Sequence, residues 1–75
     1  MTLNEFIEAF AGEFEDTDLN VFKPNTNYKE LDEWDSLVAL SIISMVDDEL
    51  DKTITGADLR KHETIEELYN FIMSK

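Results

Sequence analysis

The sequence predicts an all-α protein, a four-helix bundle of three main helices and a short third helix. Three windows place apolar residues three or four positions apart, the spacing of a helix with one buried face. Two of these windows begin with the Thr-x-x-Glu pattern of a capping box, and no window alternates as a strand does. With 75 residues, the chain is expected to form a single domain over residues 1–75.

The first helix is expected to run from Thr2 to about Glu15. Thr2 and Glu5 match a capping box, in which each side chain accepts a hydrogen bond from the backbone N–H of the other residue. One apolar face follows at helical spacing, formed by Leu3, Phe6, Ile7, Phe10, Ala11 and Phe14.

From about Asp16 to Asp35 the helical pattern ends, and an ordered loop is expected. Turn-forming residues are frequent there, and Pro24 disfavours a helix through residues 22–24. A connection of roughly 20 residues is long for a compact domain, so it needs apolar anchors of its own. The candidate anchors are Val21, Phe22, Tyr28, Leu31 and Trp34.

The second helix is expected to begin at Asp35 or Ser36 and to end at about Leu50. Most of its side chains are apolar, which predicts that it lies at the centre of the core. Leu37 and Leu40 lie at the edge of the polar strip and are expected to be partly exposed. The polar strip itself consists of Ser41, Ser44, Asp47 and Asp48.

Two further helices are expected after the apolar anchor Ile54. Thr55 and the following glycine can open a short helical turn that ends near Lys61. Thr64 opens a second capping box with the glutamate three residues later. The last helix is therefore expected over Ile65–Met73.

The composition is strongly acidic. The chain has 18 acidic and 6 basic residues, a formal net charge of −12 and a sequence pI near 4.1. Such a charge repels phosphate backbones and anionic lipid surfaces and attracts basic protein patches. We therefore expect no nucleic-acid partner and expect partner proteins with basic patches.

The absence of cysteine excludes a disulfide scaffold, a thiolate metal site and a cysteine nucleophile, and a reducing compartment fits this composition. No run approaches the length of a membrane span, and the N-terminus lacks the basic flank and apolar segment of a signal peptide. These features predict a cytoplasmic, monomeric protein without a membrane span.

Some of the acidic residues are candidate metal ligands. Asp16, Asp18 and Asn20 have the spacing that opens an EF-hand calcium loop. However, Val21 stands where such a loop needs glycine, and Asn27 stands where it needs a bidentate glutamate. We predict a solvated turn here and no metal site.

His62 is the only histidine, so a pair of histidine ligands is excluded. It is expected to fill the connection between the third and fourth helices. A chain this small has little room for a substrate pocket. We predict no catalytic residue and no enzymatic activity.

Ser36 is the most informative residue, because it follows a long loop and opens the most apolar helix. One interpretation is that its hydroxyl caps the helix by accepting a backbone N–H. The other is that the hydroxyl is displayed at a helix N-terminus, where a phosphodiester on its oxygen meets the positive end of the helix dipole. Asp35 could provide the cap instead, which would free Ser36 for modification.

Asp35-Ser36-Leu37, at the start of an apolar helix halfway along an acidic helical chain, resembles the attachment motif of the acyl carrier protein family. The resemblance covers essentially the whole chain. Further matches are the acidic end of the second helix, the apolar anchor after it and the start of the last helix, at Asp47, Asp48, Glu49, Leu50, Ile54, Thr64 and Ile65.

This resemblance implies an acyl-carrier-like bundle with 4′-phosphopantetheine esterified to Ser36, where Asp35 and Leu37 flank the attachment point. The arm would come from coenzyme A through a phosphopantetheinyl transferase, and its thiol would hold the cargo as a thioester. It also implies acyl-loading and acyl-transferring enzymes as partners. The thin apolar core could admit part of an acyl chain.

The implied recognition face lies on the second helix, at Leu37, Val38, Ser41, Ser44, Asp47 and Asp48. Fatty-acid-type members usually carry acidic side chains two and five residues after the serine, whereas this chain has Val38 and Ser41 there. The Glu33-Trp34 lead-in also differs from the common glycine-containing one. These departures predict a carrier of a specialised pathway, whose cargo could be an acyl, aminoacyl or polyketide group.

An alternative from a different class stays open. It is a non-catalytic acidic helical protein-interaction module, in which Ser36 serves only as the helix N-cap.

Overall fold

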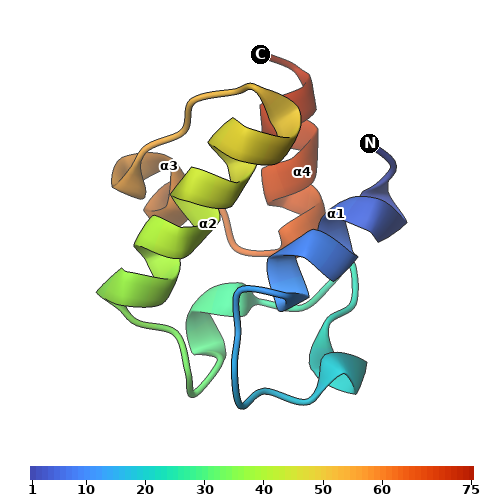
Figure 1. Cartoon of the computed structure of the whole chain (residues 1–75), viewed down its shortest axis with the longest axis vertical. Coiled ribbons are helices and arrows are strands. Elements are labelled where there is room, and N and C mark those ends of the chain that lie inside the picture. Colours follow the sequence, from blue (N-terminus) through green and yellow to red (C-terminus); the bar gives the residue numbers. More distant parts are fainter.

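The computed structural model describes all residues from Met1 to Lys75 and contains four α-helices and no strands. The helices are α1 (Leu3–Ala11), α2 (Ser36–Leu50), α3 (Gly56–Lys61) and α4 (Ile65–Met73), and two short 3₁₀ turns, η1 (Leu19–Val21) and η2 (Tyr28–Glu30), lie in the first connection (Figure 1). The expected all-α bundle with a short third helix is confirmed. None of the helices is long and apolar enough to cross a membrane.

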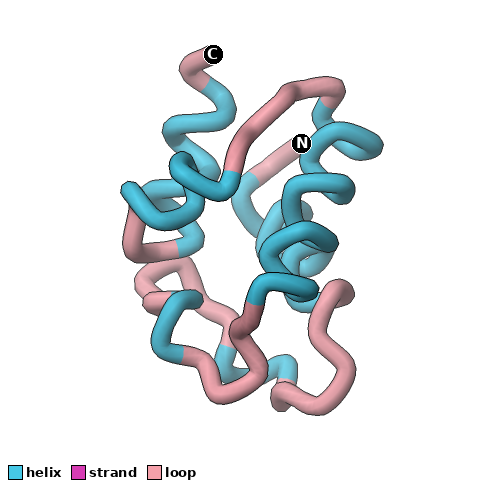
Figure 2. The backbone as a smooth tube through the Cα atoms, turned by 90° about the vertical axis from the view of Figure 1, so that its left-hand side faces the viewer, coloured by secondary structure: helices cyan, strands magenta, loops and turns pink.

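The two ends of the bundle differ. Both termini lie at one end, and the long connection between α1 and α2 gathers at the other (Figures 1 and 2). This connection leads directly into the first turn of α2, so the start of α2 projects from the loop end of the molecule.

Side-chain caps explain where the helices begin. Thr2 accepts the N–H of Glu5 at 3.2 Å, and the Glu5 carboxylate accepts the N–H of Thr2 at 2.8 Å. The same reciprocal pair opens α4, between Thr64 and Glu67. Both capping boxes expected from the sequence are confirmed, and a third one opens α3 at Thr55.

The expected extension of the first helix to Glu15 is wrong, because α1 ends at Ala11 and Gly12 is its C-cap. Glycine is the poorest helix former after proline, and the next two N–H groups bond three residues back instead of four. This tighter turn still directs Phe14 into the core, where its ring stacks on Phe10 with 5.6 Å between centroids.

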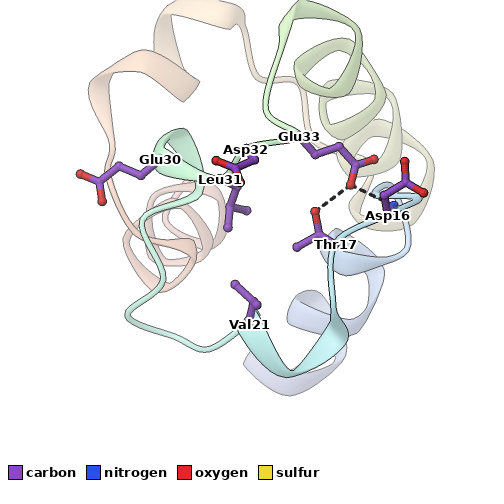
Figure 3. Close-up of a pocket in the computed structure, with 7 residues that line it drawn as sticks. All are labelled: Asp16, Thr17, Val21, Glu30, Leu31, Asp32 and Glu33. Atoms are coloured by element: carbon purple, nitrogen blue, oxygen red, sulfur yellow. Dashed lines mark hydrogen bonds between the residues drawn. The ribbon is translucent and has the colours of Figure 1, made fainter.

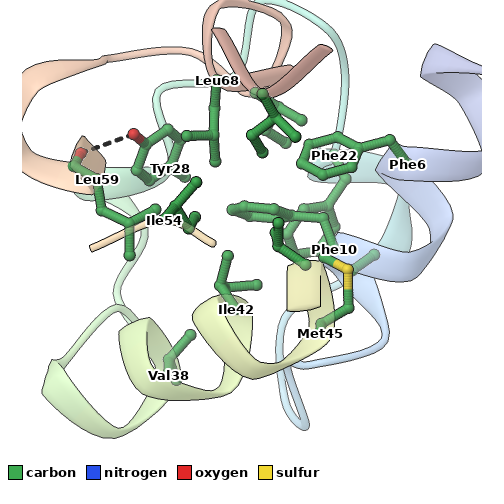
Figure 4. Close-up of a cluster of buried hydrophobic side chains, with 14 of the residues drawn as sticks. Phe6, Phe10, Phe22, Tyr28, Val38, Ile42, Met45, Ile54, Leu59 and Leu68 are labelled. Carbon is green, nitrogen blue, oxygen red and sulfur yellow. Dashed lines mark hydrogen bonds between the residues drawn. The ribbon is translucent and has the colours of Figure 1, made fainter. Parts of the chain in front are cut away.

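The core is made entirely of hydrophobic side chains, with no buried polar or charged residue. Aromatic rings from α1 and from the long connection meet the apolar face of α2 at Ile42 and Met45 (Figure 4). The hydroxyl of Tyr28 donates to the carbonyl of Leu59 at 2.7 Å, which joins the loop to α3. α2 lines the core with one face only, through Val38, Ile42, Met45 and Val46, so the sequence overestimated how much of this helix is buried.

The long connection is an ordered loop held by aromatic anchors and by α4. Phe22 and Tyr28 are buried and Trp34 is half-buried, but Val21 is exposed, so its expected role as an anchor is wrong. Val21 lies within η1 on the outer side of the turn, whereas the next residue faces the core. The N–H of Ile65 donates to the carbonyl of Thr26 at 3.2 Å, which ties the loop to the start of α4.

Asp51 ends α2 in a left-handed conformation, with φ 53° and ψ 40°. It is the only non-glycine residue with a positive φ. Glycine is the usual residue at such a helix end because a Cβ is disfavoured there.

Candidate functional site

Asp35, and not Ser36, caps α2. The backbone of Asp35 is extended, as a cap requires, and its carboxylate accepts the N–H of Val38 at 2.8 Å. Ser36 is the first residue inside the helix and is exposed. The interpretation of Ser36 as the N-cap is therefore wrong, and its hydroxyl is left at the surface without a capping role.

The start of α2 favours a negative charge. The aligned peptide dipoles of this 15-residue helix place a partial positive charge at its N-terminus. The carboxylate of the cap Asp35 takes the N–H of Val38, and no further acidic side chain lies in the first turn itself. An anionic group attached to the Ser36 hydroxyl is thus stabilised by the helix itself.

Glu33 fixes the segment that precedes Ser36. Its carboxylate accepts the backbone N–H groups of Glu15 at 2.7 Å and of Asp16 at 3.0 Å. It also accepts the hydroxyl of Thr17 at 2.7 Å (Figure 3). These hydrogen bonds, that of Thr17 first, hold the pKa of Glu33 below its usual value. The segment after α1 and the segment before α2 are joined by this one side chain.

Trp34 adds an apolar attachment next to Glu33. Its ring lies 5.0 Å from the ring of Tyr28 and 6.4 Å from that of Phe14, measured between centroids. Glu33 and Trp34 together therefore hold the loop just before Asp35, one by hydrogen bonds and the other by aromatic contacts. Nothing in the sequence indicates this role for Glu33, because its hydrogen-bond partners lie 16 to 18 residues away.

Ser36 lies on the rim of a groove between α2 and α3 with a volume of about 520 Å³. Of the hollows on the surface, it is the one that includes Ser36. Its lining combines an apolar floor with a few charged groups, from Lys29, Trp34, Asp35, Ser36, Ala39, Leu40, Ile43, Gly56, Leu59 and Arg60.

The expected recognition face is largely exposed, with one exception. Leu37 and Leu40 are 73% and 61% exposed, as expected from their place on the helical wheel. Val38 is only 9% exposed and belongs to the core, so its expected place on this face is wrong. Val38 lies one turn before Ile42 on the buried side of α2. Of the other expected positions, Ser41 is half-buried, and the exposed ones are Ser44, Asp47 and Asp48.

His62 lies in the connection between α3 and α4, as expected. Its Nδ1 is 2.9 Å from the carbonyl oxygen of Asp58, and its ring packs on Phe71 with 4.6 Å between centroids. No group of three or more His, Asp or Glu side chains is arranged to hold a metal ion.

Comparison with known proteins adds one finding. The family model described as the phosphopantetheine attachment site matches residues 4–72. No curated protein and no solved structure matches the chain.

Proposed function

Since the chain belongs to the phosphopantetheine attachment-site family, an acyl-carrier-like family, we propose that Ser36 is the residue that bears its prosthetic arm. The observation that carries this proposal is the division of roles at the start of α2. Asp35 caps the helix, and the neighbouring hydroxyl of Ser36 is exposed and free of that role.

Domains of this family are carriers and not enzymes, and their cofactor is covalent 4′-phosphopantetheine. When bound, the arm supplies a thiol that holds the cargo as a thioester. The residues present fit this group, because an exposed serine oxygen lies at the positive end of a helix dipole. The chain itself contains no cysteine, so the arm is its source of reactive sulfur.

The residues around Ser36 act as a platform. Asp35 holds the first turn of α2, and Glu33 and Trp34 hold the loop that leads into it. Behind the serine, Val38 and Ile42 anchor α2 in the core. A modifying enzyme therefore meets the hydroxyl at a defined position, without having to order a flexible segment first.

We propose that the cargo is an acyl or aminoacyl group. The partners would be the transferase that adds the arm and the enzymes that load and unload it. Exposed Leu37 and Leu40 give these enzymes an apolar contact, and Asp47 and Asp48 add exposed negative charge further along the same helix. Such a surface favours fast, weak association with basic patches. Because a free thiol persists in reducing surroundings, we place the carrier in the cytoplasm.

The test is an intact-mass measurement after incubation with coenzyme A and a promiscuous phosphopantetheinyl transferase. Wild-type protein is expected to gain one arm, and Ser36→Ala is expected to gain none. Ser44→Ala is the matched control, because it removes an exposed hydroxyl from the same helix and should still be modified. An arm on Ser36→Ala would overturn the proposal by assigning the attachment to another residue, and no arm on the wild type would overturn it in favour of a module that only binds proteins.

A further inference from the structure

We propose that the groove beside Ser36 selects cargo whose apolar stem ends in an anionic group, with Lys29 and Arg60 recognising the anion. The inference rests on the proposed attachment at Ser36 and names the chemical class of cargo for that site. The observation that supports it is that two basic side chains line one apolar groove of a strongly acidic protein.

The floor of the groove is suited to an alkyl stem. Leu59 at its base is almost fully buried, whereas Leu40 on its rim is mostly exposed. Ala39 and Ile43 lie between them along α2 and are half-buried. A stem that covers these side chains removes apolar surface from water on both partners. The volume of about 520 Å³ is within the range of sites for small ligands.

The charged side chains that line the groove are mostly basic, whereas those of the whole chain are mostly acidic. Lys29 and Arg60 are two of only 6 basic residues, and Asp35 is the one acidic residue in the lining. The lining thus has a formal charge of 2 − 1 = +1, in a protein whose net charge is −12. The Asp35 carboxylate is already engaged by the N–H of Val38. An anion is therefore attracted here by local groups, although most of the surface repels it.

Both cations are positioned by α3. The Lys29 ammonium donates to the carbonyl of Arg60 at 2.8 Å, which leaves two of its three N–H groups for a ligand. The Arg60 guanidinium extends over Gly56, where a Cβ would come within 3.3 Å of its Nη1. The absence of a side chain at Gly56 thus leaves room for a planar group that can bind a carboxylate through two parallel hydrogen bonds.

Arg60 is expected to contribute more than Lys29. The pKa of Glu67 is lowered mainly by the N–H groups of Thr64 and Glu63, with a smaller contribution from Lys29, so the Lys29 charge also acts on a carboxylate of the protein itself. The guanidinium also offers a fixed pair of donors, whereas an ammonium acts as a point charge.

A tethered cargo needs only weak recognition. A short flexible linker gives an effective concentration of about the millimolar range, so a contact too weak for a free ligand still fills the groove. An exposed ion pair shifts such an equilibrium by roughly two- to fivefold. That is enough to distinguish a charged cargo from a neutral one of the same shape.

The experiment compares two cargoes with the same stem, adipoyl and its neutral monoamide, each attached to the wild-type protein through a hydrolysis-resistant coenzyme A analogue. Intact mass first establishes that one arm is present. The backbone amide shifts of Ala39 and Leu59 then report how much cargo occupies the groove. The carboxylate is expected to give about two- to fivefold higher occupancy, and 1 M NaCl should remove the difference.

Two variants test which side chain causes the preference for the carboxylate. Arg60→Gln is expected to abolish the preference for the carboxylate. Lys61→Gln is the matched control, because it removes the same charge from the next residue of α3, outside the groove, and should keep the preference. Circular dichroism checks that both variants are folded.

Three outcomes would overturn the inference. Equal occupancy by the two cargoes in the wild type contradicts it, and so does an equal loss of preference in Arg60→Gln and Lys61→Gln. If no arm is added at all, the proposed function fails and the inference fails with it. If the arm is added but the two cargoes occupy the groove equally, the inference is overturned and the proposed function stands.

Discussion

The hydroxyl of Tyr28 lies 2.7 Å from the carbonyl oxygen of Leu59 and 3.1 Å from that of His62, and it donates to both. One fully buried side chain in the long connection thus bonds the carbonyls at the C-terminal end of α3 (Figure 4). Because α3 forms one wall of the groove at Ser36, this contact couples the loop to the candidate site.

Tyr28→Phe should lower the free energy of unfolding by about 1–3 kcal/mol, because a buried carbonyl loses its donor while the ring stays in place. Tyr69→Phe is the matched control. It removes a hydroxyl that bonds the exposed carbonyl of Met1, and its effect should stay below about 0.5 kcal/mol. Urea unfolding of the three proteins measures both values, and equal losses would contradict the buried role of Tyr28.

Glu33→Gln should destabilise the protein in a pH-dependent way. Its hydrogen bonds lower the pKa of Glu33 in the folded state, so they contribute stability above the unfolded pKa, near the ordinary value of 4.5. This contribution is lost as the pH falls through the lowered folded pKa, because the protonated acid then resembles glutamine. The difference in melting temperature between wild type and variant should therefore be full at pH 7 and shrink below about pH 4.5.

Glu30→Gln is the control for this series. Glu30 and Glu33 line the same surface hollow, but the exposed carboxylate of Glu30 makes none of these hydrogen bonds (Figure 3). A pH-independent difference for Glu33→Gln, equal to that of Glu30→Gln, would show that the three hydrogen bonds do not matter for stability.

Val38→Gln and Leu37→Gln should separate folding from partner binding. Val38 is buried, so an amide there loses apolar contacts and finds no partner, at a cost of about 2–4 kcal/mol. Leu37 is exposed, and its replacement should change stability by no more than about 0.5 kcal/mol. Leu37→Gln should instead slow the transfer of the arm onto Ser36. Chemical denaturation and a loading time course give the two readouts, and a large loss of stability at Leu37 would place it in the core.

Asp51→Gly should stabilise the protein by about 1 kcal/mol. Glycine adopts the left-handed conformation of this residue without the steric cost of a Cβ, and the change removes a negative charge from the negative end of the α2 dipole. Asp51→Ala removes only the charge and keeps the Cβ, so it should gain less. Thermal unfolding distinguishes the two variants, and equal gains would assign the effect to charge alone.

Added salt should raise the melting temperature. The net charge of −12 on a chain of 75 residues brings like charges close together, and their repulsion disfavours the compact state. The screening length falls from about 30 Å at 0.01 M to about 3 Å at 1 M ionic strength, so most of the repulsion is removed over this range. A melting temperature that does not depend on NaCl concentration would contradict this.

The sequence by itself determined the helices and their starting points, because these depend on residues three or four positions apart. Thr2 with Glu5 and Thr64 with Glu67 are local pairs, and they open α1 and α4 as predicted. The periodicity likewise predicted a helix that begins at Asp35 or Ser36 and ends at Leu50, and it marked Leu37 as partly exposed. The resemblance at Asp35-Ser36-Leu37 pointed to the family that the comparison then matched.

Other features were decided only by the tertiary structure, because they depend on residues far apart in the sequence. Glu33 meets its partners 16 to 18 residues earlier, and Lys29 meets the backbone of α3 31 residues later. Helical periodicity predicted that α2 is apolar over most of its circumference, but only packing against the neighbouring elements decided that Val38 is buried and Leu40 is exposed. A local sequence pattern reports helix propensities and helix caps, whereas burial and long-range hydrogen bonds exist only after the chain has folded.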